Sequence, residues 1–153
     1  MKTVLAFLVL AFVLFIISCR KGKFETRPRI EVKGYNTREV PPHGQLVIHL
    51  NYYDKEGDLG GGDFFAARYR LNIRPLAGSD ANLPDTLDAA HGYTVPVFPA
   101  KDQGEIDLTL DWDGFLKESN AENDTIYFRI AVSDKAGNKS DTINTDPIVI
   151  LKP

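Results

Sequence analysis

The chain has 153 residues, a formal net charge of −3 and a single cysteine. One cysteine excludes a fold held together by internal disulfides. The net acidic balance argues against nucleic acid as a partner, because a phosphate-binding face needs clustered Lys and Arg. Residues 30–153 have the length of one ordinary domain, which is enough to bury a core.

The chain begins with the pattern of an export signal. A short start with one positive charge, residues 1–3, is followed by uninterrupted apolar sequence over residues 4–17. This run is shorter than the about 20 apolar residues that a membrane-spanning helix needs. Its length is typical of the hydrophobic region of a secretory signal, so we expect a signal helix here.

The apolar run ends at Ile16-Ile17-Ser18-Cys19. This junction resembles the lipobox of bacterial lipoproteins, in which two aliphatic residues and a small one precede the cysteine. Ile17 departs from it, since smaller residues are commoner at that place. The resemblance implies that residues 1–18 are a cleaved signal peptide and that lipid on Cys19 anchors the chain to the membrane. A plain secretory signal and an uncleaved anchor remain as alternatives, and in both Cys19 is incidental.

Residues 19–29 form a basic tether punctuated by Gly and Pro. Each positive charge near an anionic headgroup contributes about 1 kcal/mol to membrane binding. In lipoproteins of the Bacteroidota type, an acidic patch just after the cysteine marks export to the outer surface. The basic tether therefore favours an anchor in the bacterial cell envelope that faces the periplasm.

After the tether, apolar and polar residues alternate with the period of half-buried strands. Strands are predicted at residues 30–33, 45–53 and 65–74. On the second, the residues assigned to the core are Leu46, Ile48, Leu50 and Tyr52. On the third, the core-facing residues are predicted to be Tyr69, Leu71 and Ile73, and the exposed ones Arg68, Arg70 and Arg74.

The alternation continues along the second half of the chain. Residues 93–98 are predicted to form an edge strand, because they are β-prone but contain Pro96. Residues 104–112 form a further strand, whose exposed face carries Glu105, Asp107 and Asp111. Only residues 114–120 suit a helical turn.

Two last strands, residues 125–133 and 141–151, are joined by a turn rich in Asp, Gly and Asn. The total is about seven short strands, each with one apolar face. This count and spacing predict an all-β fold, a single immunoglobulin-like antiparallel sandwich over residues 30–153.

Two segments also resemble known modules. Residues 127–130, Tyr-Phe-Arg-Ile, with Asp134 and residues 136–140, resemble the F strand and F–G turn of fibronectin type III and related bacterial immunoglobulin-like modules. Residues 52–60 resemble a strand-end motif in such domains of Bacteroidota lipoproteins. The disulfide of antibody domains is absent, so apolar residues such as Leu50 and Ile130 are expected to fill its place.

An acidic loop follows the second predicted strand, with alternating carboxylates and glycines that allow sharp bends. Ca²⁺ takes six to eight oxygen ligands, which such a loop supplies. In the predicted sandwich, the loop between strands 45–53 and 65–74 (the B–C loop) and the loop between strands 125–133 and 141–151 (the F–G loop) lie at the same end. The predicted calcium ligands are therefore Asp54, Glu56, Asp58, Asp134 and Asn138. It is not an EF-hand, since Phe65 stands where a bidentate Glu belongs; alternatively, these residues are only turn formers and solvated charges.

No catalytic set is recognisable in the sequence. The three histidines, His43, His49 and His91, lack the close spacing of a zinc site, and there is no nucleophile elbow. Four aromatic residues are candidates for stacking on a glycan or packing in a protein interface: Tyr53, Tyr93, Phe98 and Tyr127. Asp85-Thr86-Leu87 resembles the O-glycosylation pattern of Bacteroidota and falls in a predicted loop over residues 77–92.

These observations predict a membrane-anchored envelope lipoprotein that is not an enzyme. Its sandwich is predicted to act as a structural module or to bind an envelope protein. The alternative is a Ca²⁺-dependent carbohydrate-binding lipoprotein that uses the B–C and F–G loops.

Overall fold

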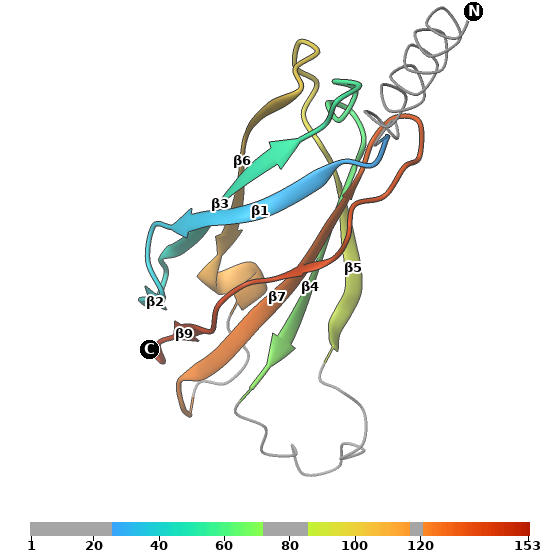
Figure 1. Cartoon of the computed structure of the whole chain (residues 1–153). Coiled ribbons are helices and arrows are strands. Elements are labelled where there is room, and N and C mark those ends of the chain that lie inside the picture. The colour runs from blue at the N-terminus through green and yellow to red at the C-terminus, as the bar shows by residue number, and fades with distance from the viewer. Residues whose placement is uncertain (1–25, 72–85, 117–120) are drawn as a thin grey trace, which may run out of the picture.

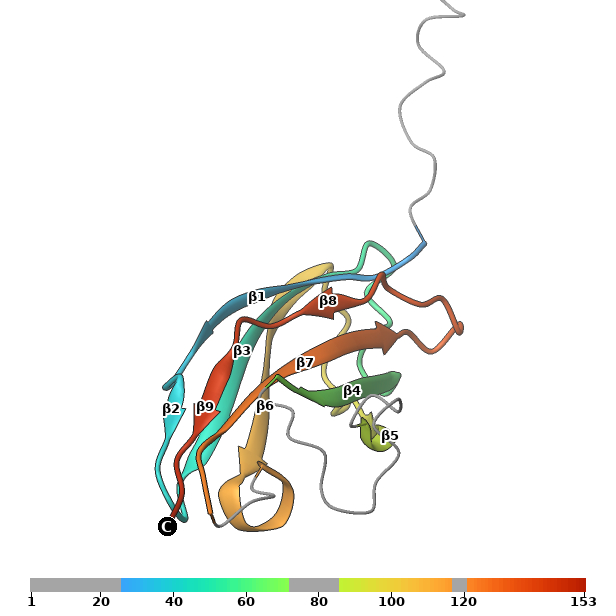
Figure 2. The ribbon, with the colours of Figure 1, turned by 90° about the horizontal axis from the view of Figure 1, so that it is seen from below.

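The computed structural model describes residues 26–71, 86–116 and 121–153, with the backbone alone for residues 86–91. Two sheets pack face to face (Figures 1 and 2). The smaller has the order β1 (Arg29–Tyr35), β3 (Gln45–Tyr53), β6 (Gln103–Asp111). The larger has the order β2 (Glu39–Val40), β9 (Ile148–Ile150), β7 (Asp124–Ser133), β4 (Asp63–Arg70), β5 (Thr86–Thr94), and β8 (Ile143–Asn144) also pairs with β7. The predicted immunoglobulin-like sandwich is confirmed.

Strand pairing is antiparallel except between β2 and β9, which run parallel. The sequence predicted neither β2 nor the division of the last strand into β8 and β9. Pro147 stands between these two short strands, where its missing N–H cannot donate to a ladder. The edge strand was also misplaced: β5 begins at Thr86, inside the segment predicted as a loop, and ends before Pro96.

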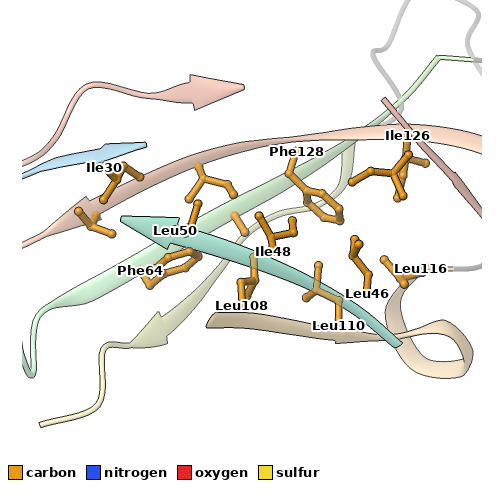
Figure 3. Packing of buried hydrophobic residues seen from close by; sticks show 14 of the residues in the cluster. Ile30, Leu46, Ile48, Leu50, Phe64, Leu108, Leu110, Leu116, Ile126 and Phe128 are labelled. Carbon is orange, nitrogen blue, oxygen red and sulfur yellow. The ribbon is translucent and has the colours of Figure 1, made fainter. Parts of the chain in front are cut away.

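The core lies between the two sheets and is built by the predicted alternation (Figure 3). In β3 and β7 every second residue is buried, including Leu46, Ile48, Ile126 and Phe128. Leu50 and Ile130 are fully buried, as expected for the positions that replace a disulfide. Strand β6 contributes Leu108 and Leu110.

The exception to the predicted pattern is β4, whose two faces are exchanged. Arg68 and Arg70 lie in the interior, whereas Leu71 is 48% exposed; Arg74 and Ile73 fall outside the described residues. The phase is set at the start of the strand, where Phe64 and Ala66 enter the core. Because side chains alternate with a period of two, this phase carries both arginines inward.

The buried arginines have polar partners at the end of the sandwich near η2, a short π-helical turn at Trp112–Leu116. The Arg68 guanidinium donates to the carbonyl oxygens of Phe115 and Leu116 at 2.7 and 2.6 Å. Arg70 forms an ion pair with the buried Asp124 at 2.5 Å. The prediction that Arg68 and Arg70 belong to an exposed basic row is therefore wrong, because both guanidinium groups bind polar partners inside the domain.

Candidate functional site

The β3–β4 and β7–β8 loops lie at the same end of the sandwich, as predicted (Figure 1). Strand β1 also begins at this end, because Arg29 pairs with Tyr53, the last residue of β3. Just beyond this pair, the Asp54 amide donates to the Asp102 carbonyl at 2.7 Å. The first described residues of the chain and the acidic loop are thus neighbours.

Asp54 is 1% exposed and organises the β3–β4 loop. Its carboxylate accepts hydrogen bonds from the backbone amides of Leu59 at 2.7 Å and Glu56 at 3.3 Å. Gly57 closes the turn by donating to the Asp54 carbonyl at 3.0 Å, with a φ of 72° that favours glycine. This carboxylate is held in place by the loop backbone.

Asp134 has the same role in the β7–β8 loop and is also buried. One of its carboxylate oxygens accepts from the Asn138 backbone amide and the other from the Asn138 side-chain amide, both at 2.8 Å. Gly137, with a φ of 85°, donates to the Asp134 carbonyl at 3.1 Å. Each loop therefore presents one fixed, buried carboxylate.

Asp58 lies between these two. Carboxylate oxygens of Asp54, Asp58 and Asp134 lie within 4.8 Å of one another. Asp58 Oδ1 is shielded from solvent and accepts no hydrogen bond within the protein. Burial raises the pKa of the Asp58 carboxyl, and the negative charges of Asp134 and Asp54 raise that pKa further.

The two loops are held together by a close backbone approach at Gly62. A Cβ at this position would stand 2.0 Å from the Ser133 carbonyl oxygen and 3.0 Å from the Asp134 Cα. The Lys135 amide adds a hydrogen bond to the Asp58 carbonyl at 3.3 Å. The glycine run in the sequence therefore serves loop packing, which brings the carboxylates together.

Of the five predicted calcium ligands, the structure brings three together. Glu56 is exposed and contributes only its backbone amide to the cluster. The amide nitrogen of Asn138 is used in a hydrogen bond to Asp134, so this residue supports the cluster as a donor.

The carboxylate geometry fits a divalent cation. Two oxygens that each lie about 2.3–2.6 Å from one Ca²⁺ are at most about 5 Å apart, and the three carboxylates meet this limit. Three carboxylates provide fewer oxygens than Ca²⁺ takes, so backbone carbonyls and water would have to complete the shell. A cation would also give Asp58 Oδ1 a partner and relieve the repulsion that raises its pKa.

His43 and His49 do not take part in this cluster. His43 bonds to Asp113 at 2.9 Å beside η2, and His49 bonds to Asp107 at 2.7 Å on the outer face of the smaller sheet. The side chain of His91 and that of Thr86, the predicted glycosylation site, lie outside the described residues.

Of the four aromatic candidates, only Tyr93 is exposed. Phe98 packs against Tyr52, with ring centroids 5.5 Å apart. Tyr127 stacks on Tyr69 at 5.1 Å, and the Arg29 guanidinium lies 4.3 Å from the centre of the Tyr53 ring. Phe98, Tyr127 and Tyr53 thus have packing partners within the domain.

Sequence reasoning missed an apolar groove of about 200 Å³ between the end of β5 and the middle of β6. It is lined in part by Phe64, Tyr93, Val95, Pro96, Ile106 and Leu108. The signal in the sequence was Pro96, which has no N–H to donate and lies just after the end of β5 at Thr94.

Comparisons with known proteins identify no family. No family model matches the chain, and no curated protein matches it. A β-glucosidase from Kluyveromyces marxianus, solved in complex with glucose, is similar over 84% of this chain and 15% of its own length, with 10% identity and a TM-score of 0.38. A likeness this distant carries no argument about function. No helix in the described part of the chain is long and apolar enough to cross a membrane.

Proposed function

We propose that the chain is a lipid-anchored lipoprotein of a bacterial cell envelope, facing the periplasm, whose sandwich binds another envelope protein and has no catalytic centre. The signal peptide, Cys19 and most of the tether lie outside the described residues, so the anchor is a proposal from the sequence. The observation that supports the proposal is the end of the sandwich at which the described chain begins.

The domain begins at the end that bears the acidic loops. From Cys19 to Thr26 the chain spans at most about 25 Å, since an extended residue covers about 3.3–3.6 Å. Arg27 holds this entry point to the β7–β8 loop by donating to the Lys139 carbonyl at 3.0 Å. A lipid on Cys19 would therefore keep the acidic loops close to the membrane and direct η2 and the sheet edges toward partners.

Lipidation is tested by replacing the thiol. In a Gram-negative host fed an alkyne-labelled palmitate, the full chain is expected to take up label and to lose residues 1–18. Cys19→Ser is expected to take up no label and to keep its leader, because only a thiol accepts the first lipid. The readouts are label incorporation and the intact mass of the purified protein. An unmodified Cys19 in a chain that keeps residues 1–18 would contradict the anchor.

A second function is favoured by the carboxylate cluster. We propose that Asp54, Asp58 and Asp134 bind Ca²⁺, which would join the β3–β4 and β7–β8 loops. The shielded Asp58 oxygen without a hydrogen bond supports this role. In the alternative role of Ca²⁺-dependent carbohydrate binding, glycans would contact exposed parts of the same loops. A glycan array with and without Ca²⁺ tests that alternative.

The charge of Asp58 is expected to lower the stability of the domain without calcium and to raise it with calcium. Because its pKa is raised above the ordinary 3.8, the native state keeps, at any pH between 3.8 and the folded pKa, a proton that the unfolded chain has lost. Stability therefore falls as the pH rises from 3.8 through the folded pKa. Asp58→Asn carries no charge, so at pH 7 in EDTA it is expected to be more stable than wild type, and the difference is expected to vanish below pH 3.8.

Calcium is expected to reverse this ranking. At free Ca²⁺ 100-fold above its Kd, the wild-type free energy of unfolding rises by about 2.7 kcal/mol, whereas Asp58→Asn gains much less. Urea unfolding at pH 7 with CaCl₂ or EDTA measures both effects. Glu56→Gln, in the same loop but exposed, is the control and should respond like wild type. A wild-type stability unchanged by CaCl₂ would end the calcium proposal.

A further inference from the structure

Strand β6 leaves one edge of the smaller sheet open. Among the described residues, β3 alone pairs with β6. Two hydrogen bonds just beyond the ends of this ladder show which residues of β6 bond to β3. The Trp112 amide donates to the Gly44 carbonyl, and the Asp54 amide donates to the Asp102 carbonyl. Even-numbered residues of β6 therefore bond to β3, because hydrogen-bonded pairs alternate in an antiparallel ladder. The backbone groups of Glu105, Asp107 and Thr109 point to the open edge.

The two faces of this edge differ in chemistry. Its outer face carries the exposed carboxylates of Glu105, Asp107 and Asp111, which also contact side chains of the same sheet, Lys33, His49 and Gln45 respectively. Its inner face is apolar, with Ile106 and Leu108 lining the groove toward β5. A strand that paired with β6 would therefore lie beside carboxylate side chains on its outer face and beside apolar side chains on its inner face.

The groove persists because the larger sheet ends beside it. After β5, the Val95 amide donates to the Gly62 carbonyl at 2.8 Å and the Val95 carbonyl accepts from Gly61 at 2.9 Å. These bonds tie this part of the chain to the β3–β4 loop. Tyr93 and Val97 flank this region at 40% and 80% exposure, and they are two of the three large apolar residues that are exposed in the described part of the chain. Grouped exposed apolar residues mark interaction sites.

We propose that an extended segment of a partner protein pairs with β6 as an additional strand of the smaller sheet. Its inward side chains would be apolar and would fill the groove; its outward side chains would be Lys or Arg, beside Glu105, Asp107 and Asp111. Backbone hydrogen bonds supply affinity in this mode of recognition, and alternate side chains supply specificity. This inference deepens the proposed binding role by naming the surface and the partner's chemistry.

A second copy of this chain is a poorer occupant of the same edge. Pairing β6 with β6 of another molecule would place two acidic rows on the same face. Like charges directly opposite one another destabilise a strand pair. The acidic row therefore selects against self-association and in favour of a basic strand.

The test uses the full chain in dodecyl maltoside micelles and a fluorescein-labelled peptide, Lys-Val-Lys-Val-Thr-Val-Lys. Fluorescence anisotropy is expected to show binding at least tenfold tighter than for a peptide of the same composition with the alternation broken. An acidic peptide with Glu in place of Lys is expected to bind at least tenfold more weakly. Equal binding of the alternating and scrambled peptides would reduce the effect to net charge and overturn the proposal.

Two variants address the edge itself. Thr109→Pro removes an amide that points to the open edge and is expected to weaken peptide binding at least tenfold, whereas Thr109→Ala keeps the amide and should bind within about twofold of wild type. Glu105→Lys with Asp107→Lys is expected to reverse the preference toward the acidic peptide. Equal binding by the two Thr109 variants would contradict strand pairing.

If Thr109→Pro fails to fold, a peptide methylated on alternate backbone nitrogens makes the same test from the partner's side. Two such peptides are compared, methylated on one or the other alternate set of nitrogens. Only one set faces β6, so binding is expected to fall at least tenfold for that peptide alone. Equal binding of both peptides would overturn the proposal. Lipid labelling of Cys19 is measured separately, so a failed anchor and a failed edge give different results.

Discussion

Replacing Gly62 with alanine is expected to destabilise the domain by about 3 kcal/mol or more, a large part of the 5–15 kcal/mol that ordinarily holds a domain folded. The new Cβ would stand 2.0 Å from the Ser133 carbonyl oxygen, which is well inside contact distance. The obstructing atoms belong to backbone and cannot rotate away. Relief requires the β3–β4 loop to part from the β7–β8 loop.

Thermal and urea unfolding of Gly62→Ala measure this loss. Gly114→Ala is the matched control, because a Cβ there meets nothing within 4 Å, and its stability should lie within about 1 kcal/mol of wild type. A Gly62→Ala protein with wild-type stability would mean that the two loops do not approach as described. The same variant is expected to weaken Ca²⁺ binding, since Asp58 and Asp134 come from the two loops that it separates.

Arg68→Leu is expected to cost about 3 kcal/mol or more, because two carbonyl acceptors lose their donor and each unsatisfied buried group costs about 1–3 kcal/mol. Arg68 is 2% exposed and donates to the carbonyl oxygens of Phe115 and Leu116. Leucine fills much of the space but donates nothing, so both carbonyls lose this donor. The turn η2, which these bonds hold against β4, should loosen first.

The control for Arg68→Leu is Arg129→Leu, which removes the same charge from the exposed face of the neighbouring strand β7. Its free energy of unfolding should change by no more than about 0.5 kcal/mol. Urea unfolding compares the two, and amide hydrogen exchange in residues 112–116 reports on η2. Similar stabilities of the two variants would show that Arg68 does not hold η2 in place.

The difference in the free energy of unfolding between the two arginine variants also tests which face of β4 is buried. The sequence favoured Tyr69 and Leu71 as core residues because both are apolar and both alternate with arginine. In that prediction Arg68 and Arg129 would both be exposed and equally tolerant of change. The structure predicts a difference of several kcal/mol between them.

Local sequence determined most of the strand segments and most of their faces. The period-two patterns of β3, β6 and β7 identify the core residues directly, because each strand buries only its apolar side. The positions of the two acidic loops at one end followed from the strand order, since consecutive strands of a sandwich place alternate loops at opposite ends.

Tertiary contacts decided the rest. The inward position of the two arginines on β4 is stabilised by the carbonyl oxygens of η2 and by Asp124, which lie 47 or more residues away along the chain from Arg68 and Arg70. The choice of Asp58 over Glu56 as a cluster member depends on how the β3–β4 loop meets Ser133. A buried polar side chain is stable only where distant groups supply its partners, and those partners cannot be read from its own strand.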